Sequence, residues 1–215
     1  MRIVLITQDD PFYLAENIDF LLERLPQGVD VSACILLPVS PFGKKETLFK
    51  KSIKTLSVFG YMFFLRYGFK YLFRKIIANK NINTVLKKRK IPIITLTSSI
   101  NSEKSLEEID GFKPDLLVSI AGNEIFRRPL LDLSTYGCLN LHSALLPKYR
   151  GLMPSFWVLK NQEVKTGVSV FFVDEGIDSG PIFVQKEIVI DGHSQQELIR
   201  ESKALGMVAI LEAIR

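Results

Sequence analysis

The chain has 215 residues, of which 47% are hydrophobic and 24% are charged. This balance is typical of a globular protein and excludes an intrinsically disordered, collagen-like or coiled-coil chain. We expect a single domain over residues 1–215, because a chain of this length buries about 70% of the surface that its unfolded form exposes. The two cysteines, Cys34 and Cys138, lie in apolar runs without metal-ligand spacing, so free thiols are expected and a metal site is not.

The net charge of +5 is distributed unevenly. Residues 43–90 hold fourteen Lys and Arg side chains and one acid, Glu46, so the rest of the chain is acidic overall. The first ten residues do not form a signal peptide, because the apolar run is short and acids follow it at once. Arg66 and Lys70 interrupt the longest apolar stretch, 55–73, which argues against a transmembrane helix. A cytoplasmic location is therefore expected.

Short apolar runs alternate along the chain with segments of helical spacing. Strands are predicted at 2–7, 29–37, 91–96, 115–121, 138–142, 166–173 and 182–190. Helices are predicted at 16–25 and 106–109, and a capping box, Ser194-Gln-Gln-Glu197, opens a last helix over 194–215. This order predicts an α/β fold with a mostly parallel sheet of about seven strands flanked by helices. The last two strands have no helix between them and are expected to pair antiparallel.

Residues 43–90 form a basic, aromatic insertion between the second and third predicted strands. Eight of the fifteen residues 59–73 are aromatic, and Arg66, Lys70 and Arg74 share one helix face. One interpretation is a connecting helix that packs on the sheet with its cations in water. The other is a basic amphipathic helix, about 55–77, that docks on an anionic membrane or on another subunit, as in a dimer. Nucleic-acid binding is not expected, because aromatics within an apolar helix do not resemble base-stacking platforms on a basic groove.

Polar side chains that could take part in catalysis lie close together in the sequence between Asn140 and Gly180. Asn140 and His142 end the fifth predicted strand, and the two-residue period of a strand points both to the same side. The carboxyl ends of parallel strands form the edge at which α/β sheets bind ligands. There an amide can donate to an oxyanion, and an imidazole can donate or move a proton near neutral pH. A purely structural hydrogen-bond pair would explain the same spacing.

A loop of acids and glycines, 173–180, links the last two predicted strands. It contains Asp174, Glu175 and Asp178. The spacing does not fit a calcium loop, because no bidentate Glu follows at the required distance. The loop is either a solvated turn or the source of a carboxylate that approaches the Asn and His pair and holds a proton or a water there.

The two motifs together resemble the folate-dependent formyltransferase family. The quoted residues are Asn140-Leu-His142-Ser-Ala-Leu-Leu-Pro147-Lys-Tyr-Arg150-Gly151, then Thr166-Gly167-Val-Ser-Val and Asp174-Glu-Gly-Ile-Asp178-Ser-Gly180. The resemblance is strong over 115–190 and loose before that. The family has a Rossmann-like fold and includes glycinamide ribonucleotide, methionyl-tRNA and nucleotide-sugar N-formyltransferases. It implies an enzyme that moves a formyl group from 10-formyltetrahydrofolate to a primary amine and needs no metal.

The resemblance implies catalytic roles for Asn140, His142 and Asp178. Asn140 and His142 would stabilise the oxyanion that forms when the amine attacks, while Asp178 would orient His142 and a water that relays the proton. The folate would lie between the loop after the fourth strand and the acidic loop. The residues implied are Ser119, Ile120, Ala121, Gly122, Asn123, Ile125, Asp174, Glu175 and Gly176. Relatives also have a cis bond at the position of Leu146-Pro147.

Departures from the family patterns bear on the acceptor. The glycinamide ribonucleotide enzymes carry a Gly-rich phosphate loop, where this chain has Gln8-Asp-Asp-Pro-Phe12, with acids that repel phosphate. The methionyl-tRNA enzymes carry a further domain that contacts tRNA, whereas this sequence ends one helix after its last predicted strand. Tyr149-Arg150-Gly151 and Pro154 resemble the sugar and tRNA branches. The sequence therefore favours a small-molecule amine, an amino sugar on a nucleotide carrier. Methionyl-tRNA, another amine, hydrolysis of 10-formyltetrahydrofolate, and a non-catalytic folate-binding module are the alternatives.

Overall fold

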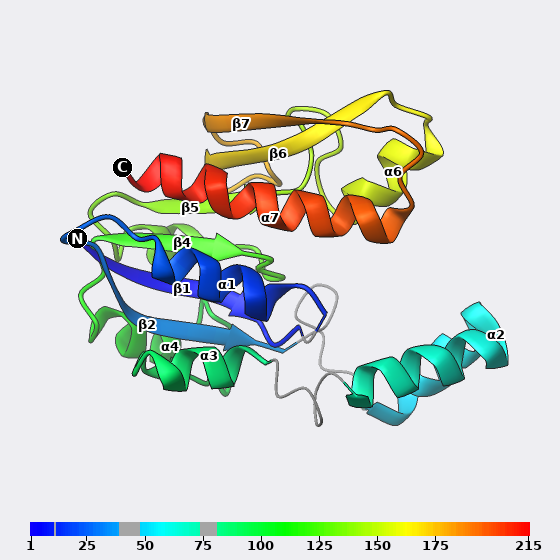
Figure 1. Ribbon diagram of the computed structural model, residues 1–215. Helices are drawn as coiled ribbons and strands as arrows, with labels where there is room; N and C mark the ends of the chain where they lie inside the picture. Colours follow the sequence, from blue (N-terminus) through cyan, green and yellow to red (C-terminus); the bar gives the residue numbers. More distant parts are fainter. Residues whose placement is uncertain (11, 39–47, 74–80) are drawn as a thin grey trace.

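A computed structural model describes residues 1–10, 12–38, 48–73 and 81–215. In these residues one seven-stranded sheet has the order β3-β2-β1-β4-β5-β6-β7 (Figure 1). The strands are β1 (Arg2–Gln8), β2 (Asp30–Leu37), β3 (Ile93–Ile94), β4 (Leu116–Ile120), β5 (Cys138–His142), β6 (Lys165–Phe172) and β7 (Ile182–Val189). Strands β1 to β5 pair in parallel, while β6 runs antiparallel to both β5 and β7. The mostly parallel α/β sheet and its antiparallel end are thus confirmed.

Helices cover both faces of this sheet (Figure 1). They are α1 (Leu14–Glu23), α3 (Ile82–Lys88), α4 (Glu103–Asp110), α5 (Arg128–Leu131), α6 (Pro154–Lys160) and α7 (Gln195–Ile214). The alternation of side chains along a strand divides the core into two layers. On β1, Ile3 and Leu5 pack with α1, α3 and α7, whereas Val4 and Ile6 pack with α4 and α5 on the opposite face.

Element boundaries differ from the sequence predictions at the sheet edge. The strand expected over 91–96 is reduced to the two residues of β3, where Pro92 has no N–H to give to a ladder and only accepts, from Cys34 N. Helix α3 was not predicted, although its cap is visible in the sequence: the Asn81 side chain accepts from Thr84 N over 2.8 Å. Helix α7 begins with the expected capping box.

The basic insertion contains α2 (Leu48–Leu72), which extends away from the sheet and its covering helices (Figure 1). Two helical arms meet at Gly60, whose φ of 79° and ψ of 171° interrupt the helix. One contact with the body is between the rings of Tyr71 and Phe12, with centroids 6.1 Å apart. The interpretation of a helix packed on the sheet is therefore wrong for this part of the chain. Arg66 is exposed, whereas the side chains of Lys70 and Arg74 lie outside the described residues.

None of the helices in the described ranges is long and apolar enough to cross a membrane. The two cysteines are free and buried, as the sequence predicts. Burial raises the pKa of the Cys34 thiol to about 12 and raises that of Cys138 as well, because an apolar interior disfavours the thiolate. Neither cysteine is therefore a nucleophile at neutral pH.

Candidate functional site

A cavity of about 530 Å³ opens at the carboxyl ends of β4 and β5. This volume lies in the usual range for small-molecule sites, and the position is the one at which parallel sheets bind ligands. Its walls come from loops after β4, β5 and β6, and from α7. Asn140, His142 and Asp178 all line it. The fold thus brings together three side chains from two separate motifs.

His142 lies between a backbone carbonyl and a carboxylate. Its Nε2 atom is 2.7 Å from the carbonyl oxygen of Tyr149, and its Nδ1 atom is 3.3 Å from Oδ2 of Asp178. A carbonyl oxygen can only accept, so Nε2 carries the hydrogen and Nδ1 faces the carboxylate. The expected approach of Asp178 to His142 is confirmed, and Nδ1 is the atom at which an incoming proton would meet a stabilising negative charge.

Burial controls the charge of this imidazole. The side chain of His142 is only 7% exposed, and burial lowers its pKa below the ordinary value of 6.5. The Asp178 carboxylate and the Tyr149 carbonyl oppose that shift, while the Lys203 cation adds to it. Desolvation has the largest effect, so His142 is neutral at pH 7 and Nδ1 has a free lone pair.

The loop between β5 and α6 holds both members of the His142–Asp178 pair. Tyr149 accepts from His142 through its carbonyl, and the Gly151 N–H donates to Asp178 Oδ2 over 2.7 Å. Tyr149, Gly151 and Asp178 have φ values of 57°, 84° and 48°, in the left-handed region. Such conformations cost energy in residues other than glycine and cluster at functional sites. The side chain of Tyr149 is anchored in turn, because its hydroxyl donates to Glu163 over 2.6 Å.

A buried polar network fixes the same loop from the sheet. The hydroxyl of Ser169, on β6, donates to the Ala144 carbonyl over 2.7 Å and accepts from Leu146 N over 3.0 Å. Gln185, on β7, donates to the Ser169 hydroxyl and to the Leu146 carbonyl, both over 2.9 Å. The Leu146-Pro147 bond is cis, as expected. Two strands without reactive groups therefore set the position of the loop.

Asn140 lies in the interior of the sheet, paired through its backbone with Ser119 on β4 and Phe171 on β6. Its side chain lines the cavity, and in the described part of the chain its amide makes no hydrogen bond. The structural pair with His142 that the spacing allowed is therefore not formed. The amide N–H₂ group remains available to a ligand.

Seven of the nine residues that the resemblance assigned to folate binding line the cavity: Ser119, Ala121, Gly122, Asn123, Ile125, Asp174 and Gly176. The side chain of Ile120 does not, because the alternation of β4 turns it into the core on the opposite face from Ser119. Glu175 does not line the cavity either and is exposed to solvent. A folate role for Ile120 and Glu175 therefore stays a prediction that the cavity lining does not support.

The loop after β4 approaches the sheet closely and is held by a segment that the sequence did not single out. A Cβ atom at Gly122 would lie 2.6 Å from the Ser119 hydroxyl, so glycine permits this approach. Before α4, the Ser99 hydroxyl donates to Glu124 over 2.7 Å, and the Asn101 amide donates to the Ile125 carbonyl over 2.8 Å. The polar run 97–102 was the feature of the sequence that could have indicated this support.

Sequence reasoning also missed Lys203, which lines the cavity from α7. Burial lowers its pKa, and the Asp10 carboxylate opposes the shift. A lysine four residues before the fully buried Met207 lies on the core-facing side of the helix, and this position could have drawn attention to it. From this position in the cavity wall it also acts on His142, whose pKa it lowers.

Asp10 lies just before α1. Its Oδ1 atom accepts from Phe12 N over 2.9 Å and its Oδ2 atom from Tyr13 N over 3.1 Å. Free N–H groups before a helix ordinarily attract phosphate. Here the Asp10 carboxylate already accepts from the N–H groups of Phe12 and Tyr13, so these two groups are not open to a phosphate.

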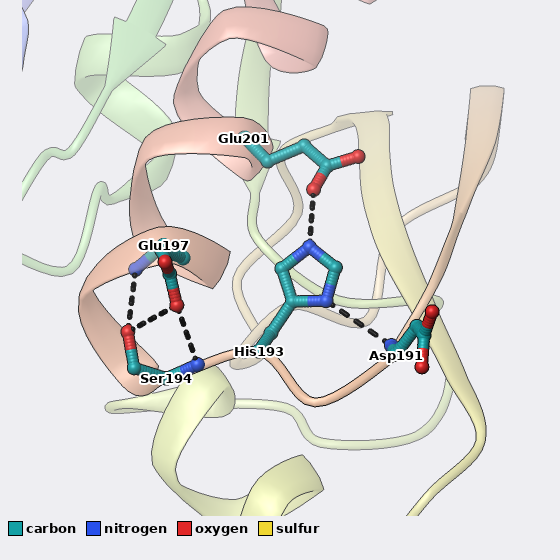
Figure 2. Close-up of polar contacts among 5 residues, drawn as sticks. All are labelled: Asp191, His193, Ser194, Glu197 and Glu201. Atoms are coloured by element: carbon teal, nitrogen blue, oxygen red, sulfur yellow. Dashed lines mark hydrogen bonds and ion pairs between the residues drawn. The ribbon is translucent and has the colours of Figure 1, made fainter.

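His193, the second histidine, has a structural position away from the cavity. Its Nδ1 atom accepts from Asp191 N over 3.1 Å, and its Nε2 atom donates to Glu201 over 2.9 Å (Figure 2). These contacts fasten the turn before α7 beside the capping box of Ser194 and Glu197. No cluster of three His, Cys, Asp or Glu side chains in the described ranges is arranged to hold a metal ion.

Comparison with known proteins identifies the family. A sequence profile described as Formyl transferase matches residues 71–214. The chain belongs to this family. The methionyl-tRNA formyltransferase of Thermodesulfovibrio yellowstonii is 36% identical over 116 residues, which cover 54% of this chain and 38% of the relative. That of Geotalea uraniireducens is 29% identical over 215 residues, which cover 100% of this chain and 58% of the relative. The chain thus spans only about half the length of these curated relatives.

Solved structures share the fold. Glycinamide ribonucleotide transformylase 1 of Symbiobacterium toebii superposes with a TM-score of 0.70 at 19% identity and covers 100% of this chain and 86% of its own. A sugar N-formyltransferase from a Shewanella species gives a TM-score of 0.62 at 19% identity and covers 100% of this chain and 68% of its own. The Rossmann-like formyltransferase fold implied by the motifs is therefore confirmed.

Proposed function

We propose that this protein transfers a formyl group from 10-formyltetrahydrofolate to a primary amine. The observation that carries the proposal is the meeting of a free amide, a neutral imidazole and a carboxylate in one cavity of a formyl transferase family member. The amide is that of Asn140, the imidazole that of His142 and the carboxylate that of Asp178.

The residues around the cavity fit a folate. Ile125, Leu152 and Ile177 line the cavity, yet each is at least half exposed. Large apolar side chains left open around a polar recess are typical walls for a flat aromatic ligand. The loop with Gly122 brings backbone groups close enough to bind the polar edge of a pterin. When bound, the folate would supply the formyl carbon.

Each of the three side chains has a separate chemical role in this proposal. The Asn140 amide donates to the formyl oxygen as negative charge develops there, an interaction that favours the transition state. His142 would take the proton released by the attacking amine at Nδ1, directly or through a water. It would then give this proton to the folate nitrogen that carried the formyl group, as the bond between that nitrogen and the formyl carbon breaks and tetrahydrofolate leaves. Asp178 stabilises the imidazolium so formed from 3.3 Å and keeps the ring oriented.

For the acceptor we propose methionyl-tRNA as the first candidate, ahead of the amino sugar that the sequence favoured. The relatives described above carry that name, and the expectation of no nucleic-acid partner has no support from them. An amino sugar on a nucleotide carrier is the second candidate, because Tyr149-Arg150-Gly151 and Pro154 suit both branches. The residues that line the cavity do not favour one of these two acceptors over the other.

The test uses the purified chain with 10-formyltetrahydrofolate and, in parallel, methionyl-tRNA or nucleotide-linked amino sugars. Mass spectrometry of the acceptor and an assay of free formate report the outcome. We expect a formylated amine in one of the reactions. Formate without formylated acceptor would identify a hydrolase, and folate binding without turnover would identify a binding module. Either result would overturn the proposed transfer.

A further inference from the structure

Helix α2 carries an array of large apolar side chains that nothing in the described structure covers. These side chains are between 40% and 79% exposed: Phe49, Ile53, Leu56, Tyr61, Met62, Leu65, Phe69 and Leu72. Figure 1 shows α2 standing clear of the sheet and of the helices that pack on it. Globular proteins seldom leave so many large apolar groups together in water, and such patches mark interaction sites.

The exposed residues follow the helical repeat on each arm of α2. On the first arm Phe49, Ile53 and Leu56 are spaced i, i+4 and i+7, which places them on one face. The second arm has an apolar face of its own. It is formed at spacings i, i+3, i+7 and i+10 by Met62, Leu65, Phe69 and Leu72. Gly60 separates the arms. Each arm is therefore too short to span a bilayer and long enough to lie along its surface.

The positive charge of α2 indicates an anionic partner. Within 48–72 the sequence contains five cations and no acid, the cations being Lys50, Lys51, Lys54, Arg66 and Lys70. Arg66 is one helical turn from Met62, beside the apolar face, where a long cationic side chain can reach a charged headgroup. A second copy of this chain would bring like charges together with no acid on α2 to pair them. Phosphates of an RNA would leave Met62, Leu65 and Leu72 in water.

We propose that α2 docks peripherally on an anionic lipid bilayer. The apolar faces of both arms enter the boundary between headgroups and acyl chains, where aromatic side chains are favoured, while the cations bind the lipid phosphates. The sheet and its cavity stay in water. This surface lies apart from the formyl transfer site, so the inference stands or falls independently of the proposed reaction.

The test is co-sedimentation of the full chain with vesicles of phosphatidylcholine alone or of phosphatidylcholine and phosphatidylglycerol in equal parts. We expect binding to the anionic vesicles that is at least about tenfold stronger than to the neutral ones, because each cation near an anionic surface contributes favourably. Binding should weaken as salt is added, because salt screens surface charge. Failure to sediment with anionic vesicles would overturn the proposal.

Paired variants separate the lipid surface from general effects of charge. Met62→Glu with Phe69→Glu should abolish vesicle binding. Val164→Glu with Val189→Glu should leave it intact, because these exposed apolar residues lie just before β6 and at the end of β7, away from α2. Lys54→Glu with Arg66→Glu should weaken binding about tenfold, and Lys87→Glu with Lys104→Glu on the body should not. Circular dichroism confirms that each variant is folded. Equal losses in the variants and their controls would contradict a specific surface.

Two other occupants of the surface give different outcomes. Analytical ultracentrifugation without lipid tests a second copy: an oligomer that Met62→Glu with Phe69→Glu dissociates would assign the surface to self-association. Fluorescence anisotropy with labelled tRNA tests a nucleic acid: binding lost in the same variant would assign it to RNA. Either result, together with failure to bind vesicles, would replace the lipid partner and leave the reaction at the cavity untouched.

Discussion

At the scale of single residues, Asn140 faces the cavity with an amide that binds nothing else in the described part of the chain. If it acts on charge that develops only in the transition state, Asn140→Ala should lower kcat by about 10²–10³ and change folate affinity little. Single-turnover rates with a verified acceptor measure this. Asn83→Ala, on α3, is the matched control and should keep the wild-type rate. A wild-type rate for Asn140→Ala would contradict the proposed role.

His142 and Lys203 lead to a prediction about pH. In the proposed reaction the neutral imidazole of His142 is the reactive form. Because burial lowers its pKa below 6.5, the acid limb of the kcat/KM profile should lie below pH 6.5. The Lys203 cation lowers that pKa further. Lys203→Met removes a positive neighbour, which makes protonation of His142 easier, so the acid limb should move to higher pH. Lys104→Met, on exposed α4, should leave the profile in place. An unmoved limb in Lys203→Met would show that the cation does not act on His142.

Residues of the site differ in how far the sequence alone could identify them. Asn140, His142 and Asp178 belong to short motifs, and the strand period already aligned the first two. The sequence missed Lys203 because its role comes from the packing of the last helix against the sheet, which no local pattern encodes. The position of Ile120 has a simpler reason: successive side chains of a strand point to opposite faces of the sheet, so its side chain enters the core while that of Ser119 faces the cavity.

At the scale of elements, the loop after β5 depends on strands β6 and β7 through Ser169. Its hydroxyl is fully buried and bonds Leu146 N and the Ala144 carbonyl. Ser169→Ala would leave a buried N–H group without a partner, which costs roughly 1–3 kcal/mol of stability. Urea unfolding should show that loss, and single-turnover rates should fall with it because the loop carries both backbone partners of the His142–Asp178 pair.

Thr166, also buried on β6, is the natural control. No partner for its hydroxyl lies in the described residues. Thr166→Val removes a polar group that is not satisfied and keeps the shape, so it should be neutral or slightly stabilising. A comparable loss of stability in both variants would mean that burial of any hydroxyl on β6, rather than the loop network, decides the outcome.

Elements of the fold were predictable to different degrees. The central strands were predicted correctly, because β1 has a continuous apolar run between polar residues and β4 is apolar except for Ser119. The edge strand β3 was overestimated because an apolar run beside Pro92 cannot extend a ladder. The sequence could not predict what α2 packs against, because an apolar, aromatic helix has the same composition whether a sheet, a membrane or another chain covers it.

At the scale of the whole molecule, α2 differs from the sheet and its covering helices both in charge and in packing. Outside 43–90, where the sheet and its cavity lie, the sequence is acidic overall. Within α2 the sequence is basic, and large apolar side chains such as Met62 and Phe69 are exposed. The proposed reaction and the proposed membrane attachment would therefore use separate parts of one chain. With α2 docked as proposed, a substrate could still reach the cavity at the carboxyl edge of the sheet.

This division predicts a contrast in amide hydrogen exchange between the two longest helices. The arms of α2 have little tertiary packing, and isolated helices of about 12 residues are marginal in water, so peptides from 48–72 should exchange rapidly. Helix α7 packs against the sheet through buried Met207, Ile210 and Leu211, and its central peptides should stay protected. Mass spectrometry of the dilute protein measures both. Anionic vesicles should slow exchange in 48–72 and leave α7 unchanged, because only the former gains a partner. Strong protection of 48–72 without lipid would show that its arms are already packed, and would contradict a free α2.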